Sequence, residues 1–235
     1  MSPDNLNSER ASDSIANEWA SETDSRNRYK KQVQYWLSQD SSNTGMLGGL
    51  DEIHEVESKF SLYFLKRVMN GRPVNRCVDV GAGIGRVTKN VLSQVFSEIH
   101  LVDPCEKFLQ KAKEDISFEI TIHPCLIQDF SFEENGEFDC WWVQWTLLYL
   151  NDHDAVSTLQ KMAENLSEEG LIIVKDNVAD DLMPDLDDFS VMRTKEQFEA
   201  LFEKANLEVI FDSPQSGLSP DICEIHCWAL QPRQT

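Results

Sequence analysis

The segment 79–86, DVGAGIGR, constrains the fold more than any other part of the sequence, because three glycines directly follow the short apolar run CVDV. Glycines between a buried strand and a helix leave backbone N–H groups open to a ligand, since no side chain fills the turn. This arrangement is typical of the first strand and first helix of a doubly wound α/β sheet. It therefore predicts both a fold class and the position of a ligand site.

Apolar runs and helical periodicities alternate along most of the chain. Parallel strands are expected at 77–80, 98–103, 120–124, 138–145 and 170–177, and helices at 85–96, 105–116, 153–167 and 194–206. Two further runs, 207–213 and 222–230, are joined by a Gly/Pro/Ser loop and predict a closing antiparallel hairpin. Two helical segments, 30–39 and 51–70, precede the first strand. The pattern predicts an α/β fold with a doubly wound sheet of about seven strands and an N-terminal helical extension.

The length of 235 residues is sufficient for one domain with a substantial core, and we assign residues 30–235 to it. Residues 1–29 are polar and poor in branched apolar side chains, which predicts a disordered tail. The sequence contains neither a signal-peptide pattern nor a run of about 18 apolar residues, so no membrane span is expected.

The formal net charge of −20 limits the partners that the protein can bind. Duplex nucleic acids and anionic membranes attract basic surfaces, so neither is expected here. A cationic partner such as a basic peptide is compatible with the charge, although solubility alone also explains it. The six cysteines form no C-x-x-C pair, which predicts reduced thiols in a cytoplasmic or nuclear protein and no metal site.

The spacing of the glycines bears on which cofactor the turn holds. Gly81, Gly83 and Gly85 form G-x-G-x-G, whereas dinucleotide sites have G-x-G-x-x-G, which would put a glycine in the place of Arg86. With Asp103 at the end of the second strand, the pattern resembles the S-adenosylmethionine site of class I methyltransferases. An acid there also suits the ribose of a dinucleotide, so an oxidoreductase remains an alternative.

The resemblance to class I methyltransferases implies a role for each of these residues. Arg86 would pair with the carboxylate of S-adenosylmethionine and Asp103 with its ribose hydroxyls. An acid near the first strand, such as Asp79, would accept its ammonium group. Gln128, in the segment LIQDF, would lie over its adenine, and the glycines would admit the body of the cofactor.

Six short motifs narrow the resemblance to one family. They are YW at 35–36, GMLGG at 45–49, GAGIGR at 81–86, QDF at 128–130, WVQW at 142–145 and VKDN at 174–177. Together they resemble the protein alpha-N-terminal methyltransferases, which methylate the free α-amine of proteins that begin X-Pro-Lys or X-Pro-Arg after methionine removal. The resemblance implies a seven-stranded, Rossmann-like class I methyltransferase fold, S-adenosylmethionine as cofactor with S-adenosylhomocysteine as product, and a basic protein N-terminus as substrate.

Three further residues belong to the cofactor side by this resemblance. Leu47, in GMLGG, would form an apolar lid with Trp36 beside it. Gln144, in WVQW, completes the candidate cofactor-binding set.

The same resemblance assigns side chains to the substrate. Asp188, in DLDDFSVMR, is the candidate catalytic carboxylate, and Asn177 would bond the substrate amine or its first carbonyl. Tyr149 joins these two as a candidate catalytic residue. Trp145 would pack on the proline ring, and Asp185 belongs to an acidic segment after the fifth strand that suits a basic third residue.

The sequence departs from the family pattern around the substrate. The family has a histidine where this chain has Tyr149, a poor base that can still orient an amine or a water. His153, four positions later, is a candidate replacement. Thr44, Leu50 and Cys223 stand where the family has an acid, an aromatic residue and a tyrosine. Activity on another amine, a small molecule or another protein site therefore remains an alternative, as does a non-catalytic module that keeps the cofactor pocket.

Overall fold

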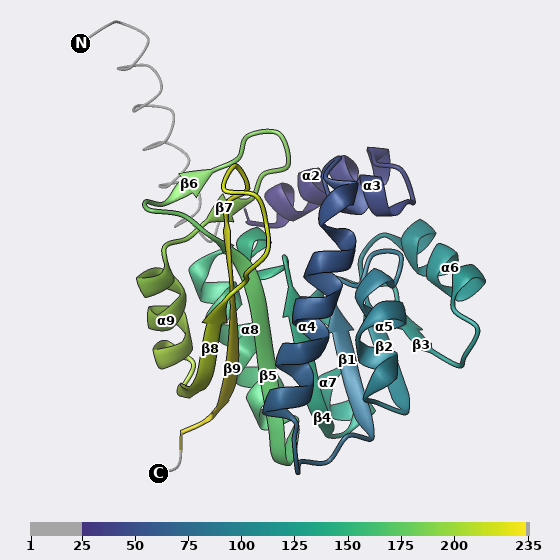
Figure 1. Cartoon of the computed structure of the whole chain (residues 1–235), viewed down its shortest axis with the longest axis vertical. Coiled ribbons are helices and arrows are strands. Elements are labelled where there is room, and N and C mark those ends of the chain that lie inside the picture. Colours follow the sequence, from purple (N-terminus) through teal and green to yellow (C-terminus); the bar gives the residue numbers. More distant parts are fainter. Residues whose placement is uncertain (1–24, 234–235) are drawn as a thin grey trace, which may run out of the picture.

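The structure, a computed structural model, describes residues 25–233 and confirms the expected α/β sheet (Figure 1). Seven strands form one sheet in the order β3-β2-β1-β4-β5-β9-β8. They are β1 Arg76–Val80, β2 Glu98–Val102, β3 Thr121–His123, β4 Phe138–Gln144, β5 Leu166–Val178, β8 Leu207–Pro214 and β9 Glu224–Pro232. The strands β1 to β5 are parallel, and β9 runs antiparallel to both β5 and β8, which is the closing hairpin.

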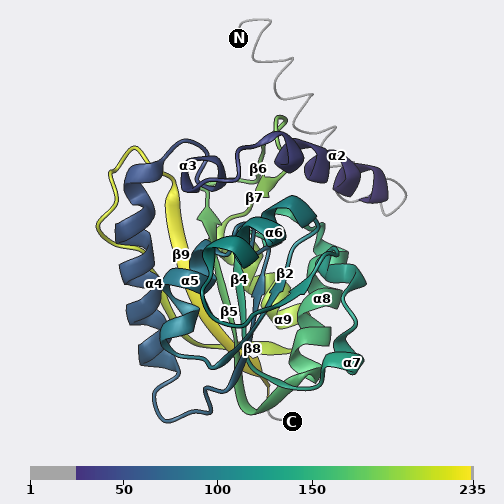
Figure 2. The same cartoon turned by 90° about the vertical axis from the view of Figure 1, so that its right-hand side faces the viewer.

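Helices cover both faces of the sheet (Figure 2). On one face lie α4 His54–Val68, α5 Arg86–Asn90 and α6 Glu106–Asp115, and on the other α7 Phe132–Asn135, α8 Asp152–Glu164 and α9 Lys195–Lys204. Every residue of β4 is buried. Trp141 and Trp142 are consecutive in this strand, so their side chains lie on opposite faces of the sheet and belong to two different hydrophobic cores. The sheet is therefore covered on both sides, as a parallel sheet requires.

The N-terminal extension lies across the carboxyl ends of the parallel strands (Figures 1 and 2). It consists of α2 Ser25–Ser38 and α3 Asn43–Met46. Helix α2 begins at Ser25 rather than at residue 30, so residues 25–29 do not belong to a disordered tail. The reason is Tyr29, which is buried and donates its hydroxyl to Asp154 of α8. The disorder predicted for residues 1–24 lies outside the described residues.

Three further segments differ in detail from the expected pattern. The helix predicted at 153–167 ends at Glu164, and residues 166 and 167 already belong to β5. The helix predicted at 85–96 leaves helical geometry at Val91, where φ is −125°, and continues as the 3-10 turn η3 Leu92–Gln94. The acidic segment after β5 forms a short hairpin of β6 Met183–Pro184 and β7 Val191–Met192, whose strands are too short to give a sequence pattern. Among the described helices, none is both long and apolar enough to cross a membrane.

Candidate functional site

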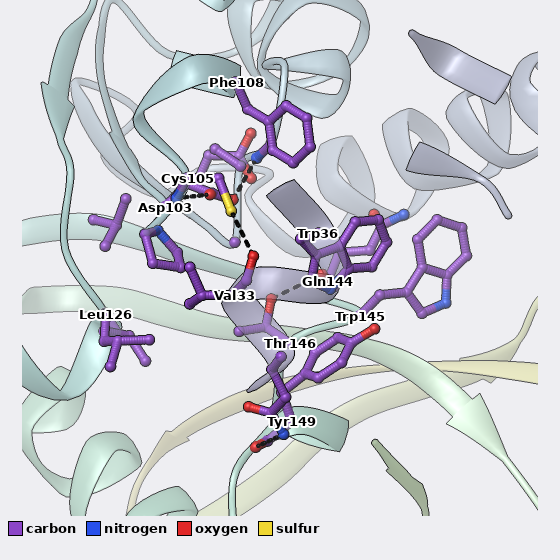
Figure 3. Close-up of a pocket in the computed structure, with 18 of the residues that line it drawn as sticks. Val33, Trp36, Asp103, Cys105, Phe108, Leu126, Gln144, Trp145, Thr146 and Tyr149 are labelled. Carbon is purple, nitrogen blue, oxygen red and sulfur yellow. Dashed lines mark hydrogen bonds between the residues drawn. The ribbon is translucent and has the colours of Figure 1, made fainter. Parts of the chain in front are cut away.

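A pocket opens at the carboxyl ends of β1, β2 and β4, beneath α2, with an empty volume of about 1060 Å³ that includes its open side. Figure 3 shows Trp36, Trp145 and Tyr149 on one side of it and Asp103 with Cys105 on the other. Most of the predicted cofactor-binding residues line it, namely Trp36, Gly81, Gly83, Arg86, Asp103, Gln128 and Gln144.

The glycine turn keeps one wall of the pocket bare. Gly81 and Gly83 have positive φ angles of 70° and 54°. A Cβ atom on Gly81 would lie 2.2 Å from Oγ1 of Thr146, and one on Gly83 would lie 2.8 Å from Sδ of Met46. Neither position has room for a side chain, so both glycines leave the backbone accessible to a ligand.

Gly85 and Leu47, unlike the other predicted cofactor-binding residues, are not among the residues that line the pocket. A Cβ atom on Gly85 would lie 2.8 Å from Ile116 and 3.1 Å from Ala112, so this glycine allows α6 to pack closely. Leu47 is buried, and its neighbour Met46 lines the pocket instead. Two glycines of the motif therefore face the pocket, whereas the third allows a helix to pack closely against the turn.

Two buried carboxyl groups flank the turn. In Asp103, Oδ2 accepts the N–H of Gly83 at 2.9 Å and Oδ1 accepts the N–H of Cys105 at 2.7 Å. Asp79 accepts both the backbone N–H and the hydroxyl of Thr88. Burial raises the pKa of Asp79 and of Asp103 to about 6. Carboxylate oxygens carry two lone pairs each, so both groups can still accept hydrogen bonds from a ligand.

Arg86 belongs to a buried charged cluster. Its Nη1 contacts the carboxylate of Glu57, which also accepts from Nζ of Lys175 at 2.6 Å and from Nε2 of Gln144 at 3.0 Å. Burial opposes ionisation of Glu57, but the charges of Lys175 and Arg86 outweigh it and hold the pKa of this carboxyl below its usual range. The Oε1 of Gln144 accepts the indole N–H of Trp142. The amide of Gln144 therefore orients the cluster around Arg86, and Gln144 also lines the pocket.

Gln128 supplies a polar group that the surrounding protein leaves unsatisfied. Its Oε1 and Nε2 are buried and have no hydrogen-bond partner of normal geometry among the described residues. A buried amide of this kind is suited to a polar ligand, because leaving it unpaired is costly. Together with the bare turn, the carboxylate of Asp103 and the guanidinium of Arg86, it fits a zwitterionic nucleoside such as S-adenosylmethionine.

Trp145 and Asn177 form a hydrogen-bonded pair at the edge of the pocket. The indole N–H of Trp145 donates to Oδ1 of Asn177 at 3.0 Å. Because an indole nitrogen only donates, this bond fixes the amide orientation and leaves the NH₂ group for an acceptor such as a peptide carbonyl. Trp145 also has a φ of 49°, which is uncommon for a residue other than glycine and is often found at functional sites.

Tyr149 and Asp188 form a second pair. The Tyr149 hydroxyl donates to Oδ2 of Asp188 at 2.6 Å, and Oδ1 of Asp188 accepts the N–H of Ser190 at 2.9 Å. Burial, and then the charge of Asp188, raise the pKa of Tyr149 well above its usual value, so this side chain stays protonated and acts as a donor. The fold thus brings together two predicted catalytic residues that lie 39 positions apart.

The other predicted residues lie further from the pocket. Asp185 is exposed, and its charge reaches Tyr35 of α2, whose pKa is raised first by burial and then by Asp188 and Asp185. The side chain of His153 is 69% exposed on α8 and does not line the pocket, so His153 does not replace the family histidine.

Sequence reasoning missed the ion pair of Glu57 and Lys175 and the buried amide of Gln32. A signal for the first was present, because Glu57 shares the apolar face of its helix with Ile53 and Phe64, and Lys175 ends the apolar run LIIV. Charged residues at such positions indicate a buried ion pair. Gln32 gives no comparable signal, because a single amide in an amphipathic helix is common.

Comparisons with known proteins agree with a pocket for S-adenosylmethionine. A family model described as AdoMet dependent proline di-methyltransferase matches residues 24–231. An N-terminal Xaa-Pro-Lys N-methyltransferase 1 of Danio rerio is 34% identical over 212 residues, which cover 86% of this chain and 95% of the relative. An alpha N-terminal protein methyltransferase 1 of Schizosaccharomyces pombe is 34% identical over 219 residues, covering 88% and 97%. The solved structure of a SAM-dependent methyltransferase of Leishmania major superposes with a TM-score of 0.82 at 27% identity, covering 87% of this chain and 83% of that one.

Proposed function

The chain belongs to the family of AdoMet-dependent proline di-methyltransferases, and we propose that it methylates the α-amine of protein N-termini that begin Xaa-Pro-Lys or Xaa-Pro-Arg. The observation that carries the proposal is the hydrogen bond of 2.6 Å between Tyr149, which lines the pocket, and Asp188 of the acidic segment. It holds a carboxylate at the edge of the cofactor pocket. A carboxylate there attracts a protonated amine and can accept its proton.

Four side chains of the protein are placed to bind different parts of the cofactor. When bound, S-adenosylmethionine supplies an electrophilic methyl carbon to the amine nitrogen. Arg86 would hold its carboxylate, Asp103 its ribose hydroxyls and Gln128 its adenine, and Asp79 is the acid available for its ammonium group. Arg86 is fixed by Glu57 and Asp103 by two backbone N–H groups, so binding requires little rearrangement of either.

The acceptor side must handle an amine whose pKa is about 8 and which is largely protonated at neutral pH. Asp188 favours entry of the cation and then accepts its proton, while the Tyr149 hydroxyl keeps the carboxylate oriented. Trp145 offers an apolar surface to a proline ring at the second position. The NH₂ group of Asn177 is available to the first carbonyl. Such alignment supplies several kcal/mol of the barrier to methyl transfer.

A basic third residue agrees with the charge of the protein. The net charge is −20, and Asp185 and Asp187 are exposed next to Asp188. An acidic mouth of this kind concentrates basic peptides and speeds their association. The attraction is screened by salt, so the KM for a basic peptide should rise with ionic strength.

The test is mass spectrometry of Ser-Pro-Lys and Ala-Pro-Lys peptides after incubation with S-adenosylmethionine. We expect methyl groups on the α-nitrogen, and none on N-acetylated peptides or on a Ser-Pro-Glu peptide. Methylation of the acetylated peptides would mean that an amine other than the α-amine is the acceptor. Absence of methylation on every free N-terminus would refute the proposal.

A further inference from the structure

We propose that Gln32 is a positioning residue for methyl transfer, because its amide fixes the two backbone segments that carry the Tyr149–Asp188 pair. Gln32 lies in α2 and is 5% exposed. Its Nε2 donates to the carbonyl oxygen of Tyr149 at 3.1 Å and to that of Phe189 at 2.7 Å. Both partners only accept, so the nitrogen of the amide must face them.

The first segment is the turn η5 Leu147–Tyr149. The carbonyl oxygens of Leu147 and Leu150 accept from the guanidinium of Arg193 at 2.9 and 2.6 Å. The carbonyl of Tyr149 lies between them and accepts from Gln32 instead. Arg193 therefore holds the two ends of the turn, and Gln32 holds the residue whose side chain reaches Asp188.

The second segment is the turn around Phe189, which directly follows Asp188. Phe189 has a φ of 62°, a left-handed conformation that aromatic residues rarely adopt. Its carbonyl is bound by Gln32, and the ammonium of Lys31 lies 5.4 Å from its ring centre. Without the bond from Gln32, this turn can relax to a commoner conformation, which would rotate Asp188 away from the Tyr149 hydroxyl.

Helix α2 also covers the cofactor pocket, which Tyr29, Gln32, Val33 and Trp36 line. One helix therefore contacts the cofactor pocket and, through Gln32, sets the spacing of the Tyr–Asp pair. The kinetic consequence of this inference rests on the proposed function, whereas its structural consequence does not.

The structural consequence is tested with Gln32→Met, which keeps the length of the side chain and removes its donors. Gln34→Met is the matched control, because Gln34 is exposed on the same helix. With S-adenosylhomocysteine bound, we expect hydrogen exchange in residues 147–150 and 185–192 to rise ~10-fold in Gln32→Met and to stay unchanged in Gln34→Met. Equal exchange in Gln32→Met and the wild type would overturn the inference, even if no peptide is methylated.

The kinetic consequence is tested with an Ala-Pro-Lys peptide. We expect Gln32→Met to lower kcat ~10- to 100-fold, because it misplaces reacting groups. Gln32 also lines the pocket, so the assay is run with S-adenosylmethionine at saturation, where a weaker affinity for the cofactor does not lower kcat. In an Asp188→Asn background the same change should lower kcat by less than ~2-fold, since residues that act through one another are not additive. Losses that multiply in the double variant would mean that Gln32 acts on the fold generally, and would also overturn the inference. A wild type that methylates no N-terminus would refute the proposed function alone.

Discussion

Replacing Asp188 by asparagine tests the acceptor site most directly, because the change removes a charge and keeps the shape. The N–H of Ser190 only donates, so the oxygen of the new amide must face it. The NH₂ group would then face the Tyr149 hydroxyl, which accepts as readily as it donates. Both native hydrogen bonds, of 2.9 and 2.6 Å, have a counterpart in the variant, so we expect it to fold normally.

The expected loss of kcat in Asp188→Asn follows from two properties of the carboxylate that the asparagine amide lacks. Asparagine neither attracts a protonated amine nor accepts its proton, and loss of a positioned general base lowers rates ~10²- to 10⁴-fold. We therefore expect kcat to fall at least ~100-fold, which corresponds to about 2.7 kcal/mol in the barrier. The affinity for S-adenosylhomocysteine should change by less than ~2-fold, because Asp188 does not line the cofactor pocket.

Mass spectrometry of an Ala-Pro-Lys peptide gives kcat, and calorimetry gives the affinity for S-adenosylhomocysteine. Asp187→Asn is the matched control, since it removes the same charge from an exposed neighbour that makes no bond to Tyr149. Its effect should fall mainly on KM. An unchanged kcat in Asp188→Asn, or an equal loss in Asp187→Asn, would refute the reasoning, because the charge of the segment and not the position of one carboxylate would then matter.

Three further changes test the cofactor side. In Gly83→Asp the new Cβ would lie 2.8 Å from Sδ of Met46, so we expect calorimetry to show S-adenosylhomocysteine binding weakened at least ~100-fold. Gly71→Asp is the control, because Gly71 also has a positive φ, of 82°, but has open space around it; its binding should not change. Glu57→Gln leaves the buried cations uncompensated and should lower the free energy of unfolding by about 3–5 kcal/mol in denaturant titrations. Burial raises the pKa of Asp79 and Asp103 to about 6, above the unfolded value, so both bind protons first in the folded state as the pH falls. As the pH falls from about 7 to 5, the contribution of these two groups to the stability of the apo protein should therefore rise, which thermal melts measure. Over the same range the affinity for S-adenosylhomocysteine should fall, because neutral carboxyl groups are weaker acceptors. An affinity independent of pH would contradict this.

The sheet and its ligand edge could be predicted because local patterns encode them. CVDV followed by DVGAGIGR identifies a strand end, and Asp103 stands at the next one. In a parallel sheet, consecutive strand ends meet at one edge, so the cofactor side was largely predictable. Gly85 shows the limit of such reasoning, because the packing of a later helix, and not the spacing of the motif, decides which way that glycine faces.

The contacts that organise the site join residues far apart in the chain. Lys175 lies 118 positions from Glu57, and Gln32 lies 117 and 157 positions from its two carbonyl partners. A period of 3.6 or 2 residues carries no information about such pairs, because they depend on how finished elements pack. The same holds for the start of α2, where Tyr29 is ordered by a carboxylate 125 positions away.

A tyrosine at position 149, where the sequence motifs lead us to expect a histidine, changes the chemistry of the acceptor site in one respect and preserves it in another. A tyrosine hydroxyl donates to Asp188 as an imidazole N–H would, so the orientation of the carboxylate is kept. An imidazole titrates near neutral pH and can take a proton, whereas the pKa of Tyr149 is raised well above its usual value. Tyr149 therefore stays a neutral hydrogen-bond donor to Asp188 at neutral pH, whereas an imidazole in its place could become a cation. Proton acceptance then falls to the Asp188 carboxylate, which lies within the acidic hairpin of a protein of net charge −20.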